Sequence, residues 1–174
     1  MAELLPLRHL RTALRTGSTR TKEKGQRFCK LAFRGHYEYT LDAKNRLTIP
    51  AKFRAPLSNG VVLAKSLDTC VSIWTPGGWE EFTEMALKSR DPFSPEARQL
   101  GRYFHAGSFD TQLDSAGRIM LPQPLIKHAG LSKEVVVVGN FDSLEVWDRG
   151  TWQSYERELD ASASETAQRL AQGG

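Results

Sequence analysis

Hydrophobic and polar residues alternate over short stretches of the chain after residue 32, with the two-residue period of a strand that has one face buried. Residues 37–41 and 47–49 alternate in this way, and strand-like apolar runs follow at 61–65 and 70–74. The pattern therefore predicts four short strands in the first half of the folded region, with a turn at 42–45 between the first two.

Other stretches have the spacing of helices. Pro50 suits the first position of a short helix over 51–57, because its missing N–H would have no partner there. Apolar residues fall on one face of the segment 79–88, and residues 95–104 form another helical stretch. Short helices between short strands predict an α+β protein that is mainly β.

The same pattern occurs twice. L-D-A-K-N-R-L-T-I-P-A-K-F-R at 41–54 is followed by L-D-S-A-G-R-I-M-L-P-Q-P-L-I-K at 113–127. The matched pairs Asp42/Asp114, Arg46/Arg118 and Pro50/Pro122 are each 72 residues apart, and the aromatic pairs Trp74/Trp147, Trp79/Trp152 and Phe82/Tyr155 are each 73 apart. The duplication thus covers about 70 residues in each copy.

Neither copy looks large enough to bury a good core alone. Two similar units in one chain can pack about a pseudo-two-fold axis or exchange strands, and the four tryptophans are expected to be core residues. The expected organisation is an N-terminal extension at 1–31, a first unit with its helix at 32–89, a connecting helix at 90–103, a second unit with its helix at 104–160, and a flexible tail at 161–174.

Charge is distributed unevenly along the chain. The net charge is +4, but residues 1–30 carry +6, which leaves −2 for the other 144 residues. Within 31–60 there is a local excess of +3. A small basic surface on a nearly neutral body suits a polyanionic partner. The leader at 1–31 could be a disordered basic arm, the result of a mis-assigned start codon, or an organellar transit peptide.

The sequence lacks the motifs that are typical of several classes of function. Two cysteines, Cys29 and Cys70, are expected to be free thiols, and the four histidines lack metal-ligand spacing. No nucleophile–base pair is recognisable, and Gly77-Gly78 is too short for a phosphate-binding loop and lacks a following lysine. The sequence therefore indicates neither an enzyme, a cofactor nor a metal site. No apolar run approaches the length of a membrane helix.

The repeated turn provides the candidate chemistry. An aspartate can accept backbone N–H groups at the start of a tight turn, and asparagine and glycine tolerate positive φ. These properties give Asp42, Asn45, Asp114 and Gly117 a turn-shaping role. The neighbouring cations can contact phosphates, and arginine can also read guanine edges. The candidate DNA-binding residues are Arg34, Lys44, Arg46, Lys52, Arg54, Arg118 and Lys127.

These residues resemble the MraZ family of bacterial transcriptional regulators, which are encoded at the head of the division and cell-wall gene cluster. The resemblance rests on F-R-G at 33–35 and on the two D-x-x-x-R motifs with their downstream prolines, and it covers about residues 33–159. One copy alone would indicate only the wider AbrB/SpoVT-like swapped-hairpin group. Family members commonly begin near residue 33 of this chain, so residues 1–31 depart from the family pattern, and Pro124 in place of Lys52 is a further departure.

The resemblance implies two tandem AbrB-like swapped-hairpin βαβ units that form an intramolecular pseudo-dimer, each followed by a helix. It also implies a cytoplasmic, nucleoid-associated protein that forms a ring-shaped homo-oligomer. Such a ring would bind short direct repeats in double-stranded promoter DNA and repress its own operon. The alternative from another class is an oligomeric scaffold that binds a protein partner through exposed aromatic residues near Trp79 and Trp152.

Overall fold

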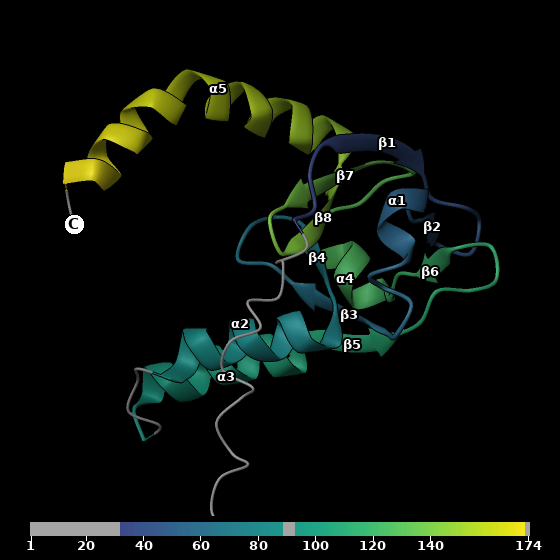
Figure 1. Ribbon diagram of the computed structural model, residues 1–174, viewed down its shortest axis with the longest axis horizontal. Coiled ribbons are helices and arrows are strands. Elements are labelled where there is room, and N and C mark those ends of the chain that lie inside the picture. Colours follow the sequence, from purple (N-terminus) through teal and green to yellow (C-terminus); the bar gives the residue numbers. More distant parts are fainter. Residues whose placement is uncertain (1–31, 89–92, 173–174) are drawn as a thin grey trace, which may run out of the picture. The chain divides into compact units, whose positions relative to one another are not determined.

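The computed structural model describes residues 32–88 and 93–172, and the N-terminal extension lies outside this part. Eight strands and five helices alternate along it (Figure 1). The strands are β1 (His36–Thr40), β2 (Arg46–Thr48), β3 (Val61–Lys65), β4 (Val71–Trp74), β5 (Ser108–Thr111), β6 (Arg118–Met120), β7 (Glu134–Asn140) and β8 (Ser143–Asp148). The helices are α1 (Ala51–Arg54), α2 (Pro76–Lys88), α3 (Pro95–Ala106), α4 (Gln123–His128) and α5 (Arg149–Gln172).

Six strands form one antiparallel sheet in the order β1-β7-β8-β4-β3-β5. Strand β1 of the first copy pairs with β7 of the second, and β5 of the second copy pairs with β3 of the first. The first strand of each copy thus belongs to the sheet of the other, while β4 and β8 join the halves at the centre. This exchange confirms the α+β prediction of two swapped-hairpin units in one chain.

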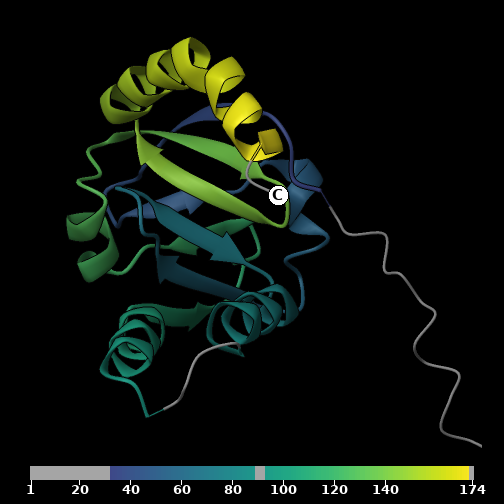
Figure 2. The same ribbon diagram turned by 90° about the vertical axis from the view of Figure 1, so that its left-hand side faces the viewer.

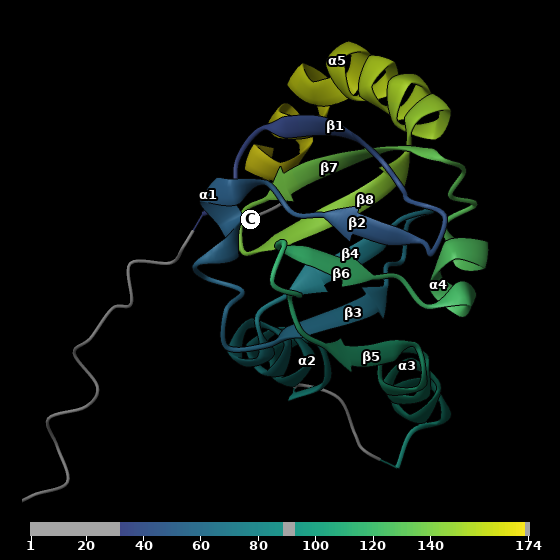
Figure 3. The same ribbon diagram turned by 90° about the vertical axis from the view of Figure 1, so that its right-hand side faces the viewer.

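A second, two-stranded sheet joins the copies again. Strands β2 and β6 pair antiparallel, with Leu47 opposite Ile119 at the centre. These two residues match in the duplication, so the centre of the β2–β6 ribbon lies on the pseudo-two-fold axis. Figure 3 shows this ribbon in front of one face of the six-stranded sheet, with α1 and α4 at its two sides.

Both faces of the six-stranded sheet carry buried residues, and alternate residues of its strands point to different clusters. One face packs against the ribbon, α1 and α4 in a core that includes Leu47, Ile49, Phe53, Leu63, Ile73, Ile119, Leu125, Val137 and Val146. On the other face, Val62 and Ala64 lie in a cluster with residues of α2 and α3, and Val136 lies in one with residues of α5. Figure 2 shows these helices at opposite ends of the sheet.

The four tryptophans are core residues, as the sequence predicted. Trp74 and Trp79 pack with Phe82 and Phe104, and the second copy repeats the arrangement with Trp147, Trp152 and Tyr155. Trp79 is 7% exposed and Trp152 8%. Neither tryptophan belongs to an exposed aromatic surface, because each indole packs against the sheet and against aromatic residues of its own cluster.

Element ends differ from the sequence expectations at three places. Helix α1 spans only Ala51–Arg54 and turns follow it. Helix α2 begins at Pro76 rather than at residue 79. Helix α5 continues to Gln172, past the expected boundary at 160, because the alanine, glutamate, glutamine and arginine residues in this stretch are good helix formers.

The central apolar pair of the ribbon should control the stability of both copies. Ile119 is 1% exposed, so Ile119→Ala should lower the free energy of unfolding by about 2–5 kcal/mol through lost burial and a cavity. Equilibrium unfolding in urea should show one transition for the whole folded region. Met120→Ala, at the exposed neighbouring position, should change stability by less than about 0.5 kcal/mol. Two separate transitions, one for each copy, would contradict this view.

Candidate nucleic-acid interface

An aspartate organises the turn between β1 and β2. Oδ1 of Asp42 accepts hydrogen bonds from the backbone N–H groups of Lys44 (2.8 Å) and Arg46 (2.9 Å). Oδ2 accepts from Nε of Arg46 at 2.7 Å. The carbonyl of Asp42 accepts from the N–H of Asn45 at 2.9 Å. One carboxylate therefore both closes the turn and fixes the arginine that follows it.

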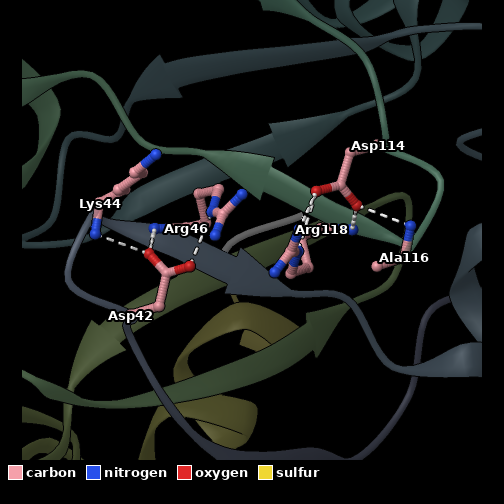
Figure 4. Close-up of polar contacts among 6 residues, drawn as sticks. All are labelled: Asp42, Lys44, Arg46, Asp114, Ala116 and Arg118. Atoms are coloured by element: carbon pink, nitrogen blue, oxygen red, sulfur yellow. Dashed lines mark hydrogen bonds and ion pairs between the residues drawn. The ribbon is translucent and has the colours of Figure 1, made fainter.

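The second copy has the same arrangement before β6. We call each such aspartate, together with the backbone N–H groups and the arginine that it binds, a clamp. Oδ1 of Asp114 accepts from the backbone N–H groups of Ala116 and Arg118, both at 2.9 Å. Oδ2 accepts from Nε of Arg118 at 2.8 Å. Figure 4 shows the two carboxylates toward opposite ends of the ribbon, with both arginine side chains between them.

Each turn contains one residue with positive φ, whose carbonyl is hydrogen-bonded to the other copy. Asn45 has φ of 57° and Gly117 has φ of 72°. The carbonyl of Asn45 accepts from the N–H of Leu121 at 3.0 Å, and the carbonyl of Gly117 accepts from the N–H of Ile49 at 2.9 Å. Each turn is thus hydrogen-bonded to the residue that follows the ribbon strand of the opposite copy, so the position of each turn depends on both copies.

The clamps are ionised near neutral pH. Hydrogen bonds from the backbone and side chain of Arg46 lower the pKa of Asp42 to about 2. The side chain of Arg118 lowers the pKa of Asp114, and the hydrogen bond and charge of Asp114 raise the pKa of Arg118. Asp42 also raises the pKa of Arg118 through its charge, which indicates that the field of one clamp reaches the other.

The clamps hold the arginines by one edge. In the part of the chain that the structure describes, Arg46 donates its side-chain hydrogen bond to Asp42 from Nε alone, and its terminal amino groups have no such partner. Arg118 uses Nε and Nη2 toward Asp114. Both side chains are about one-third exposed, at 32%. A guanidinium that is fixed at Nε and open at its other edge is pre-positioned to bind a second acceptor.

The other predicted cations fall into two groups. Lys44, Lys127 and Arg34 are exposed. Lys52 is also exposed, but it contacts the first copy itself: its Nζ donates to the Tyr37 hydroxyl and, at 3.1 Å, to the carbonyl of Arg34. The same Nζ lies 4.6 Å from the centre of the Tyr37 ring. These contacts give Lys52 a packing role in the described structure, and its contact with DNA stays a prediction.

Arg54 crosses from the first copy to the turn of the second. Its Nε donates to the carbonyl of Ile49 at 2.8 Å, and a Cβ added to Gly117 would lie 2.4 Å from the same nitrogen. The matched residue of the second copy is Ile126, which lines a pocket of about 390 Å³ beside Asp42 and Asn45. The two turns therefore have the same backbone but different neighbours.

Sequence reasoning missed two residues of this surface. Thr48 and Met120 lie on the ribbon beside the arginines, and Met120 is 62% exposed. The alternation of Arg46, Leu47 and Thr48 places Thr48 on the same side as Arg46, which is the signal that could have found it. The pairing of Met120 with Arg46 depends on the tertiary structure.

Other kinds of site find little support in the described residues. Among them, no group of three or more His, Cys, Asp or Glu side chains could hold a metal ion. Cys70 is a buried free thiol whose pKa is raised to about 12 by burial, and Cys29 lies outside the described residues. Within these same residues, no helix has the length and apolar character needed to cross a membrane.

The duplicated unit matches a known family. The family model described as "MraZ protein, putative antitoxin-like" matches twice, over residues 32–103 and 104–173. The chain belongs to the MraZ family. The resemblance read from the two D-x-x-x-R motifs is thereby confirmed, and the two matches correspond to the two copies that exchange strands.

Curated relatives from the MraZ family align over most of both chains. The chain is 38% identical over 136 residues to "Transcriptional regulator MraZ" of Thermoanaerobacter pseudethanolicus, covering 78% of this chain and 94% of that protein. It is 41% identical over 140 residues to the protein of the same name in Roseiflexus castenholzii, covering 80% and 97%. The protein of that name in Lachnoclostridium phytofermentans is 42% identical over 122 residues, covering 70% and 85%.

The two left-handed positions should respond differently to substitution. Gly117→Ala should lower the free energy of unfolding by about 1–3 kcal/mol, since alanine is strained at this φ and its Cβ would displace Arg54. Asn45→Gly should change it by less than about 0.5 kcal/mol, because glycine adopts the same backbone freely. Urea unfolding of both variants measures the difference. Equal stability of wild type and Gly117→Ala would show that the turn adapts.

The Asp42 clamp should weaken only in strong acid. The native pKa of about 2 lies below the value of about 3.9 for an unfolded aspartate. A lowered native pKa means that the carboxylate stabilises the fold above about pH 4 and that this contribution is lost as the pH falls toward about 2. The side-chain carboxyl carbon shift of Asp42 should titrate with that midpoint by NMR. A midpoint near 4 would mean that the clamp does not form in solution.

Proposed function

We propose that this protein is a transcriptional regulator that binds double-stranded DNA through the β2–β6 ribbon and its two clamped turns. The observation that carries the proposal is the pair of arginines, each held at Nε by an aspartate and each about one-third exposed. The relatives named as transcriptional regulators support the regulatory role.

The two-stranded form of the ribbon suits the major groove. The major groove of B-form DNA admits a two-stranded β-ribbon, and arginine is the residue that most often contacts guanine O6 and N7. Because Nε of Arg46 is occupied by Asp42, its two terminal amino groups remain to form a bidentate contact. Anchoring the side chain in the free protein also lowers the conformational entropy that binding would otherwise cost.

Charge at the turns favours contacts with the DNA backbone. Lys44 lies at the tip of the first turn and is exposed, whereas Ala116 takes its place in the second. Arg34 and Lys127 add exposed cations on other elements. These cations supply the non-specific phosphate attraction that orients a protein before bases are read. On this proposal the first turn makes more of the phosphate contact.

We also propose a DNA target and an oligomeric assembly for the protein. The protein would repress its own division and cell-wall operon by binding short direct repeats in the promoter, as a ring-shaped homo-oligomer. A single ribbon reads few base pairs, so several linked subunits would gain affinity through avidity. The alternative is an oligomeric scaffold that binds a protein partner through exposed aromatic residues near Trp79 and Trp152, and the burial of these two tryptophans gives it no support.

Removal of one clamped arginine tests the proposal. Arg46→Ala should weaken binding to the DNA immediately upstream of the coding region by about 5- to 150-fold, the range for one bidentate base contact. A mobility-shift titration at fixed salt measures the change. Arg102→Ala is the matched control, because Arg102 is an exposed cation on α3, which packs against the sheet face opposite to the ribbon.

Two outcomes would overturn the assignment. One is unchanged affinity of Arg46→Ala for this DNA, with the variant folded by circular dichroism. The other is an equal loss in Arg102→Ala and Arg46→Ala, which would indicate only general electrostatic attraction. A ring that forms in light scattering but is indifferent to the DNA would favour the scaffold.

A further inference from the structure

Four side chains form the outer face of the β2–β6 ribbon. Successive strand residues point to opposite faces, and Leu47 and Ile119 are buried in the core. Their neighbours in the two strands therefore point outward. Figure 3 shows no helix or strand in front of the β2–β6 ribbon. We call this set the ribbon face, and it consists of Arg46, Thr48, Arg118 and Met120.

The register places these residues in two cross-strand pairs. Arg46 lies opposite Met120, and Thr48 lies opposite Arg118. Side chains directly opposite in an antiparallel pair have Cβ atoms about 4.5–5.5 Å apart. The two arginines therefore occupy one diagonal of the ribbon face, and Thr48 and Met120 occupy the other. Each arginine has one neighbour across the ribbon that is not an arginine.

Only one of the two diagonals keeps the internal symmetry of the fold. The pseudo-two-fold axis exchanges Arg46 with Arg118, which leaves the arginine diagonal unchanged. It also exchanges Thr48 with Met120, which differ in size and chemistry. A half-turn of the protein on DNA would therefore present the same arginines but move a thioether to the position of a hydroxyl.

Met120 is an unusual residue for this position. It is 62% exposed although it lies in a short strand whose central residue is buried, so the core does not account for it. An apolar side chain in the major groove contacts the 5-methyl group of thymine, and the flexible thioether of methionine adapts to such a surface. Thr48 is partly buried and smaller, with a hydroxyl that can bond to several bases.

We propose that Met120 and Thr48 give the ribbon its polarity on DNA, with Met120 contacting the 5-methyl group of a thymine next to the base pair that Arg46 reads. The arginines alone would select a two-fold symmetric sequence. The Thr48/Met120 difference makes the preferred sequence asymmetric and fixes one orientation of the chain. This inference rests on the proposed function and extends it to residues that determine base preference.

Uracil substitution isolates the predicted methyl contact, because uracil is thymine without its 5-methyl group. The probe is a duplex that the wild-type chain selects from a random-sequence library, with each thymine replaced in turn by uracil. One thymine next to an arginine-dependent guanine should be sensitive, with a loss of affinity of about fourfold for one methyl group. Fluorescence anisotropy at fixed salt measures each affinity.

The variants assign that methyl contact to a residue. Met120→Ala should bind the thymine and uracil duplexes equally, while Met85→Ala should keep the wild-type difference. Met85 is a fitting control because it is also an exposed methionine, at 72%, but lies on α2. Thr48→Met makes the ribbon face symmetric. This variant should therefore show a second uracil-sensitive thymine on a duplex in which a thymine is placed at the position related to the first by the pseudo-two-fold axis of the ribbon.

The inference fails if Met120→Ala keeps the full uracil sensitivity, or if no thymine of the selected duplex is sensitive in the wild type. It also fails if the selected sequence is a perfect palindrome. The proposed function fails separately, if Arg46→Ala binds the selected duplex as tightly as the wild type. A chain that loses binding with Arg46→Ala but ignores uracil would keep its function and lose this base preference.

Discussion

The pairing of β2 with β6 is the interaction on which the rest of the molecule depends. It places Leu47 against Ile119 at the centre of the core, and it brings two turns that are 72 residues apart in sequence into one surface. The exchange of β1 and β5 between the halves ties the six-stranded sheet to the same axis. Because each half completes the other, the ribbon is formed only when both copies are folded.

The two aspartate clamps hold the arginine side chains of the ribbon in place at the protein surface. In each carboxylate, one oxygen accepts hydrogen bonds from two backbone N–H groups and the other accepts one from an arginine Nε. An exposed ion pair alone would stabilise the fold little. The hydrogen bonds from the backbone N–H groups add to the ion pair, since they fix the position of the carboxylate that holds the arginine. The two guanidinium groups are therefore held in place without being buried, as a binding surface requires.

Much of the fold was predictable because the same sequence pattern occurs twice in the chain. The strands at 61–65 and 70–74, the helix at 95–104 and the burial of the tryptophans follow from periodicity and from the matched aromatic pairs. Helix ends were less predictable: α5 continues to Gln172 because its alanine-rich stretch favours helix although little of it is buried.

The family, the duplication and the local chemistry of each turn could be read from the sequence: an aspartate, then an asparagine or glycine that accepts positive φ, then an arginine. Those properties are local, since they depend on residues within one turn. Three contacts became visible only in the folded chain: Arg54 lies over the turn of the other copy, Lys52 packs on Tyr37, and Met120 lies opposite Arg46. Each of these contacts joins distant residues, and their register is set by how the two copies pack.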